Sequence, residues 1–235
     1  MTMTMDPLTS TRLALHRVAA YVVSPARRHA TGNEIALAVT PGGFGTPALG
    51  DDEAVRVDGA RLVRRRGGVE DATELTTLRE AGAFAGVEPD VAWASAFDIP
   101  APGDLDAPLD VDAGAARRLA DFLALADGAL AALRASAAPG DDASAISLWP
   151  EHFDVAIDSG PEAEGLRATY GGSPGDDAHP EPYLYVAPWE RRAGRFWNDA
   201  AFGGAHLAES ELRADADPLA AALAFFERGR RELAA

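Results

Sequence analysis

Apolar residues recur at helical intervals in four stretches of the chain. In the first, over 13–23, Leu15, Val18 and Val22 fall on one face of a helix. Ser24-Pro25 predicts the end of this helix, because the residue before a proline disfavours helical backbone. The other three stretches carry capping signals, and helices are predicted over 77–85 with a Thr77–Glu80 capping box, over 112–138 with Asp112 as cap, and from Asp217-Pro218 to the C-terminus.

Alternation of apolar and polar residues predicts strands between these helices. Residues 34–40 alternate, with Ile35, Leu37 and Val39 on one face, and a loop rich in glycine and proline follows. The remaining strands are predicted over 54–58 and 61–65, joined by an Asp58-Gly59 turn, and over 145–158, 166–170 and 183–187.

Neighbouring strands without a regular βαβ alternation favour the α+β class, with mostly antiparallel sheets and about four helices. We expect a single domain over 1–235, with halves 8–138 and 145–235 joined through the long helix 112–138. Both halves contain a strand, a glycine-rich loop, acidic residues and a helix. An old duplication would explain this similarity, and chance in a chain rich in alanine and glycine is the stronger alternative.

The charge balance is strongly acidic, with 37 Asp and Glu against 21 basic residues and a net charge of −16. All the basic residues are arginine, which is typical of a high-GC coding bias, and a salt-adapted surface is the alternative explanation. The negative field disfavours nucleic acid and anionic membrane surfaces as partners. The absence of lysine excludes Schiff-base chemistry, and the absence of cysteine excludes disulfides and thiolate chemistry and favours a cytoplasmic location.

One stretch brings a histidine close to a carboxylate. If 149–157 is a strand, His152 and Asp154 lie side by side on its polar face. A carboxylate orients an imidazole and raises its basicity, which suits a general base or a metal ligand. The loop that follows adds candidate metal ligands, namely Asp177, His179 and Glu181 beside Asp176. Their spacing matches no established metal motif, and the alternative is an ordinary strand pair followed by a turn.

Aromatic residues follow in the same region. Tyr183 and Tyr185 share one face of a predicted strand, and Trp189 continues their register. With Tyr170 and Trp197, these side chains are candidates to line a cleft that stacks a planar or sugar-like ligand. The alternative is a cross-strand aromatic ladder at a sheet edge.

The order of several short motifs also carries information. These are Leu15-His16, the strand 35–40 with its loop, Val55-Arg56-Val57, Phe153–Ala156, Glu181–Tyr185 and Asp217–Phe225. Their order resembles an uncharacterised bacterial family that is catalogued only as a domain of unknown function. The resemblance implies one integrated domain, and it brings no activity or catalytic residue.

Three functions therefore remain open at the level of sequence. The first is a small-molecule binding or accessory protein that uses the aromatic face. The second is an enzyme, such as a metal-assisted hydrolase, in which His152 and Asp154 act with His179 and Glu181. The third is a structural or interaction protein without a site. The sequence identifies no cofactor and does not decide between enzyme and non-enzyme.

Overall fold

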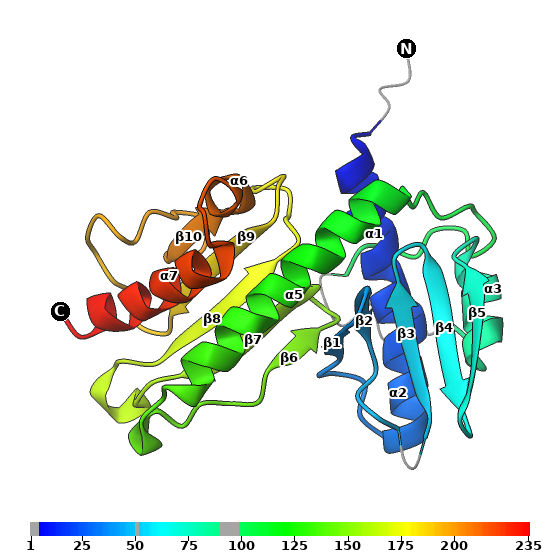
Figure 1. The fold of residues 1–235 in the computed structure, drawn as a ribbon, viewed down its shortest axis with the longest axis horizontal. Helices are drawn as coiled ribbons and strands as arrows, with labels where there is room; N and C mark the ends of the chain where they lie inside the picture. The colour runs from blue at the N-terminus through cyan, green and yellow to red at the C-terminus, as the bar shows by residue number, and fades with distance from the viewer. Residues whose placement is uncertain (1–4, 50–51, 90–98) are drawn as a thin grey trace. The chain divides into compact units, whose positions relative to one another are not determined.

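The computed structural model describes residues 5–49, 52–89 and 99–235 (Figure 1). The chain forms two compact units. The first unit comprises Met1–Asp121 with Leu148–Phe153, and the second comprises Phe122–Ser147 with Asp154–Ala235. The structure contains two five-stranded antiparallel sheets, each with its strands in sequential order, together with helices. This confirms the predicted α+β class, while the single domain stays a prediction.

The first unit begins with a nearly continuous helical segment. Helix α1 (Pro7–Val18) runs into a π-helical turn, η1 (Ala19–Val23), and then into α2 (Ser24–Thr31). The prediction that Ser24-Pro25 ends the helix is therefore wrong. A proline ring normally clashes with the carbonyl four residues earlier, and the wider π turn directly before Pro25 relieves that constraint.

The first sheet has the strand order β1-β2-β3-β4-β5. Its strands and the following helix are β1 (Ala38–Thr40), β2 (Gly43–Gly45), β3 (Ala54–Asp58), β4 (Arg61–Arg66), β5 (Val69–Glu74) and α3 (Leu78–Ala85). The predicted hairpin at Asp58-Gly59 is confirmed, and Thr77 caps α3 by accepting the N–H of Glu80. Strand β5 was missed because its residues are almost all exposed, so no buried alternation marks it.

The chain returns to the first unit for only six residues, Leu148–Phe153. Backbone hydrogen bonds of 2.8 Å in both directions join Leu148 to Leu37. Phe153 lies against His16 in a stacked arrangement, with ring centroids 5.3 Å apart, and edge-on to Phe44 at 5.1 Å. His16 Nε2 lies 2.9 Å from the carbonyl oxygen of Pro150. These contacts fix the short return segment onto the first unit.

This return segment corrects the strand predicted over 145–158. Strand β6 (Ser147–Trp149) and strand β7 (Asp154–Ser159) are separated by a turn, in which the N–H of Phe153 donates to the carbonyl of Trp149 at 2.7 Å. Phe153 adopts a positive φ of 55°, which reverses the chain direction locally. His152 lies in this turn and Asp154 opens β7, so the two residues do not share the face of one strand.

The second sheet has the order β10-β9-β8-β7-β6. The remaining elements are α5 (Ala113–Ala135), η2 (Pro139–Asp141), η3 (Glu162–Glu164), β8 (Ala168–Ser173), β9 (Tyr183–Pro188), β10 (Ala205–Ala208), α6 (Glu209–Arg213) and α7 (Pro218–Leu233). The predicted caps of the two long helices are confirmed. Asp112 accepts the N–H of Ala115 at 2.8 Å, and Asp217 accepts that of Ala220 at 3.0 Å.

The two faces of the second sheet differ in character. Figure 1 shows α5 and α7 on the same side of the strands β7 to β9. On this side Tyr170 is fully buried and meets Phe226 of α7 edge-on at 6.0 Å. Because side chains alternate along a strand, Tyr183, Tyr185 and His206 lie on the opposite face. Among the described residues, no helix is both long and apolar enough to cross a bilayer.

Candidate functional site

The polar face of the second sheet carries a cluster of two histidines and one aspartate. His206 lies on β10, while His179 comes from the loop before β9 and Asp199 from the loop before β10. One ligand atom from each of the three side chains lies within 4.8 Å of the other two. We call these three residues the His–Asp–His cluster.

Asp199 is the buried centre of this cluster, with a side chain only 3% exposed. Its Oδ1 accepts the N–H of Ala201 at 2.8 Å, which fixes the turn that follows, and its backbone pairs with Gly204 across that turn. Its Oδ2 lies 2.7 Å from His179 Nε2 and 2.7 Å from His206 Nδ1. One carboxylate oxygen therefore faces both imidazoles.

His206 faces the same oxygen. Its Nδ1 is buried and lies 2.7 Å from Asp199 Oδ2, and this contact helps to hold the pKa of Asp199 low. The backbone of His206 is held on both sides by the side chain of Asn198, which donates to the carbonyl at 3.1 Å and accepts the N–H at 2.9 Å. The imidazole is thus held in place beside Asp199.

Asp176 supports His179 from the other side of the ring. Its Oδ1 lies 3.1 Å from His179 Nδ1 and accepts the backbone N–H groups of Ala178 and His179, both at 2.7 Å. Tyr183 donates its hydroxyl to Asp176 Oδ2 at 2.6 Å, and its ring lies 4.4 Å from the ring of His179. This arrangement orients His179 so that Nε2 points to Asp199.

Both aspartates are held in the charged form. Burial acts to raise the pKa of Asp199, but the N–H of Ala201 and the neighbouring His179 outweigh it, so the pKa lies below its usual value. Burial also acts to raise the pKa of Asp176. The hydrogen bonds from the Tyr183 hydroxyl and from the N–H groups of His179 and Ala178 outweigh burial, so this pKa is lowered too. Two negative charges, those of Asp176 and Asp199, therefore lie around His179 at neutral pH.

Tyr185 extends the same face towards β7. Its hydroxyl donates to Asp154, which is buried at the start of β7. The ring crosses strand β8 at Gly171, where a Cβ atom would come within 2.5 Å of the phenol. Burial and the charge of Asp154 raise the pKa of Tyr185 well above its usual value, so the phenol stays protonated.

The other predicted site residues are not members of this cluster. His152 is exposed in the turn of the first unit. Glu181 accepts both the backbone N–H and the hydroxyl of Ser210, at 3.1 and 3.0 Å, and Asp177 is exposed in its loop. A catalytic role for His152 with Asp154, and metal roles for Asp177 and Glu181, stay predictions. His179 is the one predicted metal ligand that lies in the cluster.

The predicted aromatic set is also divided. Tyr183 and Tyr185 lie 6.2 Å apart and adjoin the cluster. Tyr170 is buried on the helix-covered face. Trp189 is exposed under the guanidinium of Arg167 at 5.0 Å, and Trp197 packs edge-on against Phe196 at 4.9 Å.

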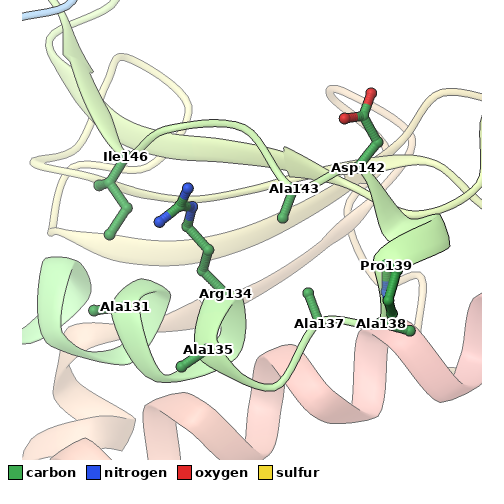
Figure 2. Close-up of a pocket in the computed structure, with 9 residues that line it drawn as sticks. All are labelled: Ala131, Arg134, Ala135, Ala137, Ala138, Pro139, Asp142, Ala143 and Ile146. Carbon is green, nitrogen blue, oxygen red and sulfur yellow. The ribbon is translucent and has the colours of Figure 1, made fainter.

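A separate hollow of about 440 Å³ lies between the end of α5 and residues 139–146 (Figure 2). Its lining is mainly alanine, and its one guanidinium, from Arg134, is bonded to the carbonyl of Ser144 at 2.8 Å. None of its lining residues belongs to the His–Asp–His cluster. Because it offers few groups able to orient a ligand, we do not assign a site there.

The sequence reasoning missed Asp199 and gave no role to His206. The sequence does contain a turn signal, Asn198-Asp199 followed by Gly203-Gly204. Such a turn returns Asp199 towards the short strand β10. The sequence matches no family model, no curated protein and no solved structure at a significant level.

Proposed function

We propose that this protein binds a divalent transition-metal ion through His179, Asp199 and His206. The supporting observation is that electron-rich atoms converge on one point. A neutral imidazole carries one N–H, so a His179 that donates from Nδ1 to Asp176 turns the lone pair of Nε2 towards Asp199 Oδ2, 2.7 Å away. A cation placed between these two atoms would be coordinated by both of them.

The donor set selects the class of metal. Two imidazole nitrogens and one carboxylate oxygen suit zinc, iron and related first-row ions, whereas magnesium and calcium prefer oxygen ligands alone. Two histidines and one carboxylate also leave coordination positions open for water or a ligand. The contact of Asp176 with the outer nitrogen of His179 is the support that metal-bound histidines typically have.

The geometry requires only a small adjustment to accept such an ion. Ligand atoms about 2.0–2.1 Å from a tetrahedral zinc ion lie roughly 3.3 Å from one another. The two contacts of 2.7 Å to Asp199 would therefore lengthen by several tenths of an ångström. Rotation of the His206 side chain, which is 29% exposed, would lengthen one of these contacts.

Cobalt(II) titration of chelator-treated protein tests the proposal, because cobalt reports its coordination by visible absorption. We expect one cobalt ion per chain, displaced by zinc. Asp199→Ala and His206→Ala each remove one ligand and should abolish the absorption at the same cobalt concentration. His29→Ala removes an exposed histidine of the first unit and serves as the matched control, with unchanged stoichiometry.

Two results would contradict the proposal. The first is wild-type protein that binds no cobalt or zinc in calorimetry. The second is a cobalt spectrum that survives both ligand substitutions, which would place the ion elsewhere. Either result would leave the cluster as a hydrogen-bonded support for the loop 197–204.

A further inference from the structure

A partly exposed phenylalanine lies beside the His–Asp–His cluster. Phe202 belongs to the turn that follows Asp199, and 38% of its surface is exposed, which makes it one of the few large apolar side chains at the surface of the described residues. Its ring meets His179 edge-on at 6.4 Å and Tyr185 edge-on at 6.0 Å. A partly exposed phenyl ring at this position can contact a ligand that binds at the cluster.

The turn that contains Phe202 fixes the position of its ring. Gly204 follows Phe202 by two residues, and a Cβ atom on Gly204 would come within 2.4 Å of the phenyl ring. The same turn is fixed by Oδ1 of Asp199 and by the backbone pairing of Asp199 with Gly204. One local structure therefore positions both the carboxylate of the cluster and the aromatic ring beside it.

The surroundings of the cluster favour a flat, apolar ligand body. Phe202, Tyr183 and Tyr185 present ring edges and faces around the two histidines. In the described part of the chain, the hydrogen bonds and ion pairs of Asp176, Asp199 and both histidines involve no arginine. A bound metal ion would supply the positive partner for an anionic group on a ligand.

From this arrangement we infer that the site takes a planar aromatic ligand with adjacent oxygen donors, of the catechol type. The oxygens would occupy the open coordination positions while Phe202 contacts the ring. The inference rests on the proposed metal binding and adds the class of ligand. Aromatic pairs contribute about 0.5–1.5 kcal/mol beyond the area that they bury, so the loss of Phe202 should weaken such a ligand about 10-fold.

The test uses the cobalt-loaded protein and two chelating probes, 4-nitrocatechol and the aliphatic acetohydroxamate. We expect 4-nitrocatechol to bind the wild type and to shift the cobalt absorption. Phe202→Ala should weaken 4-nitrocatechol about 10-fold, leave acetohydroxamate and cobalt affinity unchanged, and be rescued by Phe202→Tyr. Leu219→Ala, which removes another exposed apolar side chain, is the matched control and should change nothing.

The outcomes separate this inference from the proposed function. If cobalt binds but Phe202→Ala leaves 4-nitrocatechol affinity unchanged, or weakens both probes equally, the aromatic ligand class is wrong and the metal site stands. If wild-type protein binds cobalt but not 4-nitrocatechol, the inference is again overturned. If cobalt does not bind at all, the proposed function fails and the ligand class fails with it.

Discussion

His16 should make the first unit sensitive to acid. The imidazole is largely buried beside Phe153, and its Nε2 lies 2.9 Å from the carbonyl oxygen of Pro150. Burial lowers its pKa from 6.5 to about 4, and the nearby charges of His152 and Arg12 act in the same direction. The hydrogen bond to Pro150 opposes this shift without cancelling it.

The sign and the size follow from linkage. Between pH 6.5 and about pH 4, His16 binds a proton in the unfolded chain but not in the folded chain. The free energy of unfolding therefore falls as the pH falls through this window. Above pH 6.5 both states are neutral and His16 contributes no pH dependence. With one pKa unit equal to 1.36 kcal/mol, the loss is about 2 kcal/mol at about pH 5 and about 3 kcal/mol below pH 4.

The substitution His16→Gln isolates this effect, because glutamine keeps an N–H donor for the carbonyl of Pro150 and does not titrate. Urea unfolding is followed by hydrogen exchange in peptides of the first unit, at about pH 7.5 and about pH 5. We expect the stability difference between wild type and variant to shrink by about 2 kcal/mol at the lower pH. His29→Gln, at an exposed position, should keep the wild-type slope. Equal slopes for wild type and His16→Gln would refute the reasoning.

Three further predictions concern the second unit. Asp176→Asn should lower cobalt affinity about 10- to 100-fold with unchanged stoichiometry in titration, because it weakens the contact that orients the ring of His179. An unchanged affinity would show that the contact between Asp176 and His179 does not support metal binding. Gly171→Ala should destabilise the unit by about 1–3 kcal/mol in urea unfolding, because the new methyl group meets the phenol of Tyr185; Gly171→Ala combined with Tyr185→Ala should recover part of that loss. Asp217→Ala should cost about 1 kcal/mol through loss of the α7 cap, and Asp217→Ser should restore most of it in the same assay.

Local chemistry explains which parts of the fold the sequence could predict. Asp112, Thr77 and Asp217 cap their helices as predicted, because a cap depends only on residues within one turn. The hairpin at Asp58-Gly59 is equally local. The predicted break at Pro25 failed because a π turn accommodates the ring, and such a turn has no recognised sequence signal.

The site was harder to predict because it depends on loops. His152 and Asp154 would share one face if residues 149–157 formed a single strand. A turn of four residues instead separates β6 from β7. His179 and His206 are 27 positions apart and meet only because β9 and β10 pair and Asp199 is returned by a turn. No periodic pattern encodes a contact that forms between a loop and a neighbouring strand.

A metal site and a purely structural cluster require different protonation states of the two histidines. A structural role requires a proton on both nitrogens of His179, because each nitrogen faces a carboxylate. The loop that a structural cluster would secure is already tied to β10 by the side chain of Asn198. An ion needs only the neutral form of each imidazole. The metal role therefore has fewer protonation requirements, which is why we favour it.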